Sequence, residues 1–220
     1  MYFQKLFAFS TILIAAAANI SAQEPAPAPG QVGSSLTRGF SAFIISEPRF
    51  PETDVHNRKN KFHDLVNDHG LRPTLATFVR QVPKDADSPT VQLLKKQDEL
   101  AVKHARSRLG TYSVFLTLTN EYRKDETRDA KKTELETFAN GLGAKLLTVG
   151  LASATITPDG AAAPVVPPEV QAIGFGPEDD IVVLLYNDFR IRHRWVFRSE
   201  GSTADDLAAI EKAVADLLKN

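Results

Sequence analysis

The C-terminal part of the chain decides the fold, and it reads IVVLLYNDFRIRHRWVFR over residues 181–198 and TADDLAAIEKAVADLL over residues 203–218. The uninterrupted apolar run over residues 181–186 is typical of a strand that is buried on both faces. Asn187 and Asp188, two residues that favour turns, follow it directly. The pattern therefore predicts a buried strand after which the chain turns back at once.

The stretch after this turn alternates with period two, as a half-covered strand does. Its apolar set is Ile191, His193, Trp195 and Phe197, and its basic set is Arg190, Arg192, Arg194 and Arg198. We expect an antiparallel hairpin in which Trp195 is buried and the basic face is wet, because burying arginines costs far more than exposing an aromatic ring. A cap at Ser202 or Thr203 then predicts a final amphipathic helix.

The residues upstream alternate between strand and helix patterns. Strands are predicted over residues 40–46, 74–79, 112–118 and 146–152, and helices over residues 59–69, 88–108 and 130–142. Residues 157–170, TPDGAAAPVVPPEV, are rich in proline, glycine and alanine and predict an irregular surface insertion. Such alternation indicates an α/β class with a mixed sheet and helices on both of its faces.

Three segments resemble the thioredoxin-like fold superfamily. They are the closing hairpin with its helix, the strand TLATFV (residues 74–79) with the long helix that starts at Pro89, and the strand YSVFLTL (residues 112–118). The resemblance covers residues 70–218 and rests on the order of the elements. It implies a thioredoxin-like mixed sheet flanked by helices, ending in a β-hairpin and a C-terminal helix.

The chain departs from that family where the chemistry would be. The loop that carries two cysteines in the family reads RQVP here, over residues 80–83, and the whole chain contains no cysteine. This excludes disulfide exchange, cysteine peroxidase chemistry and thiolate metal sites. The family also has a cis-proline before the hairpin, for which Pro177 is the nearest candidate. We therefore predict no catalytic, cofactor-binding or metal-binding residue and no cofactor.

The N-terminus predicts export. Residues 1–22 combine one basic residue, Lys5, with an apolar run over residues 6–18 and a small residue at Ala22, as in a cleaved secretory signal peptide. Residues 23–35 are rich in proline, alanine and glycine and predict a linker, so the α/β domain is expected over residues 36–220. We expect a secreted or periplasmic protein with no stable membrane insertion after signal cleavage. The net charge of −1 gives no general attraction to nucleic acid.

Histidines and carboxylates gather in the stretch HDLVNDH, residues 63–69. His63 and His69 are six positions apart on the expected helix and do not share a face, so a metal site is not predicted. A hydrolase-type enzyme on the same scaffold is the alternative hypothesis, and it would need a His/carboxylate pocket, for example near His56, His63 and Asp64.

The basic residues Arg190, Arg192 and Arg194 are the most specific surface feature. They could contact an anion or an acidic partner, or they could protect an edge strand from aggregation. The leading hypothesis is an exported, non-redox thioredoxin-like domain that acts as a binding or structural module. Its partner would be an unidentified protein or an acidic ligand, and not a nucleic acid.

Overall fold

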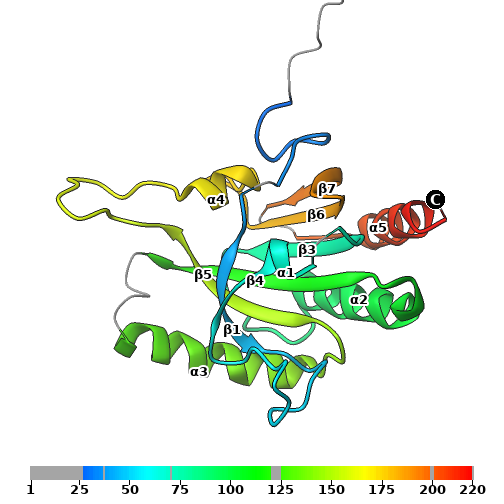
Figure 1. Cartoon of the computed structure of the whole chain (residues 1–220), viewed down its shortest axis with the longest axis horizontal. Helices are drawn as coiled ribbons and strands as arrows, with labels where there is room; N and C mark the ends of the chain where they lie inside the picture. Colours follow the sequence, from blue (N-terminus) through cyan, green and yellow to red (C-terminus); the bar gives the residue numbers. More distant parts are fainter. Residues whose placement is uncertain (1–26, 37, 70, 120–124, 199–200, 220) are drawn as a thin grey trace, which may run out of the picture.

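The computed structural model describes residues 27–36, 38–69, 71–119, 125–198 and 201–219. Its centre is a mixed sheet in the order β2-β1-β5-β4-β3-β6-β7 (Figure 1). The strands are β1 Ser41–Ser46, β2 Phe62–Asp64, β3 Thr74–Val79, β4 Gly110–Thr119, β5 Thr148–Thr155, β6 Ile181–Asn187 and β7 Arg190–Phe197. The helices are α1 Leu65–His69, α2 Pro89–Lys103, α3 Asp125–Leu142, α4 Pro168–Ala172 and α5 Ala204–Leu217, with a 3-10 turn at Ala105–Ser107. The mixed sheet, closing hairpin and C-terminal helix predicted from the sequence are confirmed.

The topology explains why the longer helices share one face of the sheet. Strands β3, β4 and β5 are parallel and adjacent in that order, so the two crossovers through α2 and α3 run in the same direction. Right-handed crossovers in one direction place both helices on the same side. One apolar cluster accordingly joins α2, α3 and α5 to this face, through residues such as Leu94, Leu135 and Val214.

The opposite face is covered by shorter segments. A second apolar cluster joins α1, α4 and the N-terminal segment to this face, through Leu65, Val170 and Leu36. The insertion expected at residues 157–170 contains the start of α4, and an isolated bridge pairs Ile156 with Val165 in front of it. This yellow segment extends away from the sheet in Figure 1. In the described part of the chain, no helix has both the length and the apolarity needed to cross a membrane.

The described part of the expected linker, residues 27–35, packs against the domain. The Gly33 amide donates to the Ile191 carbonyl at 2.8 Å, and the Ile191 amide donates to Ser34 at 3.0 Å. The Leu36 amide donates to the Phe189 carbonyl at 2.7 Å and continues this ladder, and the Leu36 side chain is buried. The segment satisfies an edge of β7 that would otherwise expose unpaired backbone groups. Residues 23–26 lie outside the described residues, as does the expected signal peptide at 1–22.

The helix predicted over residues 59–69 is wrong in its first half. Phe62–Asp64 forms the edge strand β2, which pairs antiparallel with β1, and only Leu65–His69 is helical. The side chain of Asp64 accepts hydrogen bonds from the amides of Phe40 at 2.9 Å and Asn67 at 3.1 Å. It thus ends the strand and starts the helix, because a carboxylate satisfies amides that a helix start leaves free.

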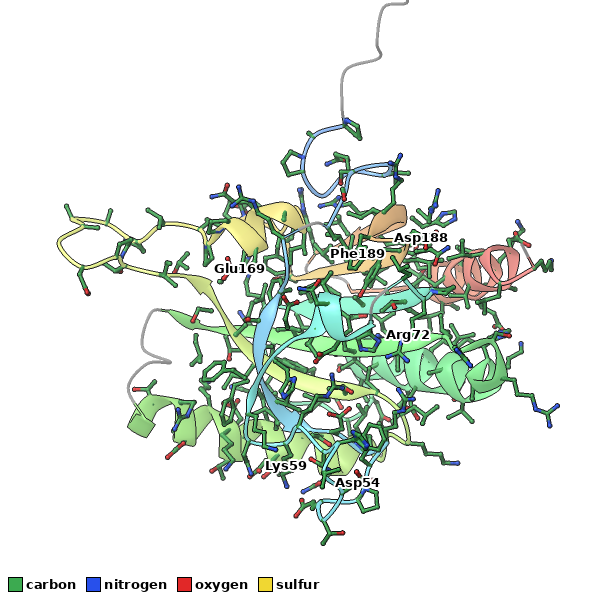
Figure 2. All side chains as sticks on the ribbon, viewed as in Figure 1. Asp54, Lys59, Arg72, Glu169, Asp188 and Phe189 are labelled. Atoms are coloured by element: carbon green, nitrogen blue, oxygen red, sulfur yellow. The ribbon has the colours of Figure 1, made fainter. Side chains whose placement is uncertain are left out.

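The hairpin turn lies one residue later than predicted. Asp188 and Phe189, both labelled in Figure 2, have positive φ angles of 52° and 57°. Two consecutive residues in this region form the tight turn whose twist matches a β-hairpin. Asn187 is consequently the last residue of β6, and Arg190 is the first of β7.

The alternation along β7 does not keep one set of side chains on one face. Tyr186 pairs with Ile191, but Leu185 pairs with His193, so the register shifts by one residue at Arg192. A bulge of this kind exchanges the faces of all later residues. Ile191 belongs to the cluster beneath α1 and α4, whereas Phe197 and the partly buried Trp195 belong to the cluster beneath α2 and α5. The prediction of one buried face was therefore wrong.

Candidate functional site

The position of the family's redox loop lies between the end of β3 and the start of α2. Arg80 opens the loop and is fixed to the segment before β6. Its Nε donates to the carbonyl of Asp179 at 2.8 Å, and its Nη2 donates to the carbonyl of Gly176 at 2.5 Å. Its guanidinium also lies over the Phe175 ring, 4.7 Å from the ring centre. The residue that begins the loop therefore has a structural role.

No prepared nucleophile is found in this loop. Ser88 caps α2 by accepting a hydrogen bond from the Val91 amide at 3.4 Å, and Pro89 occupies the first turn of the helix. A cavity of about 480 Å³ adjoins the loop and has polar lining from Gln81, Lys84 and Asp180. None of its lining residues is a histidine that could activate a hydroxyl. The described residues contain no cis peptide bond, so Pro177 is trans.

The histidines and carboxylates that the hydrolase hypothesis requires do not converge on one point. His63 Nδ1 lies 3.1 Å from Asp68 Oδ2, and Asp64 accepts hydrogen bonds from the amides of Phe40 and Asn67. His56 is exposed and contacts the Phe50 ring. Among the described residues, no group of three or more histidines, cysteines, aspartates or glutamates is placed to hold a metal ion.

The arginines of β7 are separated by the bulge. Arg190 and Arg192 are exposed, but Arg194 is half-buried under the segment that contains α4. Its Nη2 donates to the carbonyl of Gly174 at 2.8 Å and lies 3.8 Å from a carboxylate oxygen of Asp179. The three side chains therefore do not form a continuous cationic stripe, and the expectation of a wet face fails at Arg194. His193, expected to be packed, is exposed and stacks on Trp195.

A pocket that the sequence did not reveal lies at the other end of the sheet. Three parallel strands, β3, β4 and β5, begin here, and the antiparallel strand β1 ends here. The pocket has a volume of about 470 Å³. Its lining, which we call the arginine pocket, consists of Glu47, Arg49, Arg58, His69, Arg72, Ala105, Arg108, Leu109, Gly110, Thr111, Leu146 and Thr148. Four arginines and a single acidic residue thus line one cavity.

One of the four arginines is already neutralised. The side chain of Glu47 is fully buried and accepts hydrogen bonds from Arg58 Nε at 2.6 Å and Arg58 Nη2 at 2.5 Å. Arg58 also donates to Asp68 from its remaining nitrogen, at 2.5 Å. This pairing is bidentate and matches the planar geometry of a guanidinium. It also compensates a carboxylate whose burial would otherwise be unfavourable. Glu47 is therefore committed to Arg58.

The other three arginines, Arg49, Arg72 and Arg108, form no ion pair with a carboxylate of the described residues. Arg72, labelled in Figure 2, lies where α1 passes into β3. Its Nη2 is 2.8 Å from Nδ1 of the buried His69, so Nδ1 accepts the hydrogen bond. Its Nε is buried without a partner. The arginine pocket thus retains positive charge that the protein itself does not compensate.

His69 is neutral in this setting. Burial is the main cause, and the guanidinium charges of Arg72, Arg58 and Arg49 add to it, so the pKa of His69 lies well below the usual value of 6.5. Because Nδ1 accepts from Arg72, the ring proton is on Nε2, which is buried without a partner. No local sequence pattern around His69 indicates the arginines that surround it.

The lowered pKa predicts a pH dependence of stability. The unfolded chain takes up a proton at this residue as the pH falls below about 6.5, whereas the folded chain does not, so the stabilising contribution present at higher pH is lost on acidification. At about 1.4 kcal/mol per pH unit, the free energy of unfolding should fall by up to about 2 kcal/mol more between pH 7 and pH 5 than in His69→Gln. Urea unfolding at both pH values measures this. His193→Gln should behave as wild type, and equal losses in wild type and His69→Gln would contradict the assignment.

The arginine pocket could not be found from local sequence. Arg49 and Arg58 come from the loop after β1, Arg72 from the loop after α1, and Arg108 from the turn before β4. No motif with fixed spacing connects these three loops, which meet only because the parallel strands start at one edge. The only available sequence signal was the pair of arginines in the loop FPETDVHNRKN and its flanks, which alone indicates a solvated loop.

Comparison with known proteins shows the architecture. No family model and no curated protein sequence matches the chain. Among solved structures, a candidate thiol:disulfide interchange protein, DsbE from Chlorobium tepidum, has a TM-score of 0.55 at 15% identity and covers 86% of this chain and 98% of its own. AhpC from Mycobacterium tuberculosis has a TM-score of 0.53 at 13% identity, covering 85% and 92% respectively. An uncharacterized conserved protein from Geobacillus kaustophilus has a TM-score of 0.54 at 11% identity, covering 90% and 88%. Taken with the order of the sheet and its closing hairpin, these similarities show that the chain has the thioredoxin-like fold, in a form without cysteine.

Proposed function

We propose that this chain is an exported binding module built on the thioredoxin-like fold, and that it works without redox chemistry. One observation carries the proposal: the scaffold is complete around the redox-loop position, yet the loop has no sulfur nucleophile. Arg80 and Ser88 in that loop are engaged in holding the backbone. Thiol–disulfide exchange needs a thiolate, which no residue of the chain can supply.

The hydrolase alternative gains no support from the geometry. A hydrolytic site needs a nucleophile and a base within hydrogen-bond reach, with a third group to orient the base. His63 has a carboxylate partner in Asp68, but neither residue lines the arginine pocket or the cavity beside the redox-loop position, and His56 contacts the Phe50 ring instead. A surface that binds a ligand without catalysing its turnover needs no nucleophile or base, and it is therefore the simpler interpretation of these contacts.

The proposal is tested on the natural, exported protein. The expected result is a mature chain whose mass begins near Gln23, found outside the cytoplasm, with no reduction of insulin disulfides and no turnover of peroxide. A bona fide thioredoxin serves as the positive control in the same assay. Thiol-type activity of the pure, cofactor-free chain would overturn the non-redox proposal, and an intact Met1 in the exported fraction would overturn the export proposal.

A further inference from the structure

We propose that the arginine pocket binds a small phosphate-bearing anion. The inference deepens the proposed function, on which it rests, by giving the binding module a class of ligand. The arginine pocket adjoins the N-terminal ends of the parallel strands β3, β4 and β5. The redox-loop position follows the C-terminal end of β3, so the two sites lie at opposite ends of the strands. The ligand would therefore bind away from the position where related folds carry their cysteines.

The charge of the pocket is the first argument. Four arginines line it against one glutamate, and that glutamate is committed to Arg58. The charge of Arg49 adds to burial in lowering the pKa of Arg72, so these two guanidinium groups repel one another, and no carboxylate of the described residues pairs with either. Repulsion between like charges in a partly buried cavity is screened less than on an open surface. An anion between these guanidinium groups would relieve it.

The buried donors are the second argument. Three polar atoms of the lining residues are buried and have no hydrogen-bond partner: His69 Nε2, Arg72 Nε and Thr111 Oγ1. His69 is 6% exposed and Thr111 only 4%. Nε2 of His69 and Nε of Arg72 can only donate, and the threonine hydroxyl can also donate. Buried polar groups in folded proteins are almost always paired, and an anion that reached these three donors would pair them.

The shape of the pocket narrows the class of ligand. Its donors come from four different parts of the chain, the loop after β1, the end of α1, the turn before β4 and the start of β4. A tetrahedral phosphate accepts hydrogen bonds in several directions, whereas a carboxylate accepts mainly in one plane, and arginine suits phosphate because its fork pairs with two oxygens at once. A volume of about 470 Å³ is that of a small-molecule site, larger than one inorganic phosphate requires. A phosphate ester or a diphosphate fits both conditions.

Isothermal titration of the folded chain with pyrophosphate, inorganic phosphate and citrate tests the inference. Pyrophosphate should bind more tightly than phosphate, and citrate should bind at least tenfold more weakly than pyrophosphate. Arg72→Gln should weaken pyrophosphate binding at least tenfold. Arg108→Gly should also weaken it several-fold without harming the fold, because Arg108 has a φ of 57°, a conformation that glycine adopts freely.

Arg106→Gln is the matched control. Arg106 is an exposed arginine of the 3-10 turn that ends just before Arg108, and it does not line the pocket, so its replacement should leave pyrophosphate binding unchanged. Absence of pyrophosphate binding at millimolar concentration, tighter binding of citrate, or equal binding by Arg108→Gly and wild type would each overturn the inference. None of these results would restore thiol activity, so the inference can fail while the non-redox proposal stands.

Discussion

Replacing Asp98 with alanine is expected to lower the free energy of unfolding by about 4 kcal/mol. The carboxylate of Asp98 is buried on α2 and accepts hydrogen bonds from three consecutive amides, those of Lys145 at 2.9 Å, Leu146 at 2.7 Å and Leu147 at 2.8 Å. A hydrogen bond to a charged group contributes about 1.5–3 kcal/mol, and amides left buried without a partner add their own desolvation cost. The three bonds share one acceptor group, so their contributions do not simply add.

The amides that Asp98 binds belong to the connection between α3 and β5, which explains the size of the expected effect. This segment has no strand partner before Thr148, and Asp98 substitutes for one. Asp98→Asn should cost less than alanine, because its carbonyl can still serve Leu146 and Leu147 while its NH₂ group would oppose the Lys145 amide.

Urea unfolding followed by circular dichroism measures both Asp98 variants. Glu99→Ala, which removes an exposed carboxylate from the next position on the same helix, should unfold as wild type does. If Asp98→Ala unfolded within 1 kcal/mol of wild type, the carboxylate would not be the acceptor that holds this connection.

The sequence allowed the fold to be predicted where a single strong pattern controls the outcome. The apolar run of β6 must be covered on both faces of the sheet, and the apolar face of α5 must pack against a neighbouring element. Each pattern therefore permits only one placement of its element in the fold. The sequence predicts the start of α3 at residue 130, whereas the helix begins at Asp125, because its first turn is charged and has no apolar residue to mark it. Element boundaries without apolar residues leave little trace in a sequence.

The errors along β7 and near β2 have tertiary causes. The alternation of residues 190–195 is strict in the sequence, but a one-residue bulge at Arg192 cancels it, and the bulge depends on the register with Leu185 and Tyr186. Residues 62–64 have a helical apolar spacing, yet pairing with β1 satisfies their backbone better than a first helical turn would. A pattern read along one segment does not include the hydrogen bonds offered by another.

The candidate site could not be predicted from the sequence for a related reason. The sequence did identify what the chain lacks, since the absence of cysteine follows from composition alone. The arginine pocket, in contrast, combines Glu47 with Thr148 and Arg58 with Arg108, pairs far apart in the chain that meet through the parallel order of β3, β4 and β5. Each arginine taken alone is an ordinary loop residue, and only the topology makes them a cluster.

Replacing Glu47 with glutamine is expected to lower the free energy of unfolding by about 3 kcal/mol and, at the same time, to strengthen pyrophosphate binding several-fold. Glu47 has no exposed side-chain surface and neutralises Arg58 through two hydrogen bonds. Removing one partner of a buried ion pair leaves an uncompensated charge, a change that costs about 3–5 kcal/mol, and glutamine recovers part of it through one carbonyl oxygen. The Arg58 guanidinium then keeps only Asp68 as a carboxylate partner among the described residues, so more of its charge acts on the pocket, which favours an anion there.

These two opposite effects separate a structural role of Glu47 from its influence on the pocket. Thermal unfolding should show a lower melting temperature for Glu47→Gln than for wild type. The same excess of pyrophosphate should raise that temperature more in the variant, because a ligand that binds only the folded state stabilises it by an amount that grows with the logarithm of its affinity. Glu52→Gln is the control, since Glu52 is exposed and pairs with Lys59 outside the pocket, so it should change neither quantity appreciably. A Glu47→Gln chain that melts lower and gains no more from pyrophosphate than wild type would show that Arg58 does not contribute to the anion site. In that case the positive charge of the pocket would have to act through Arg49, Arg72 and Arg108 alone.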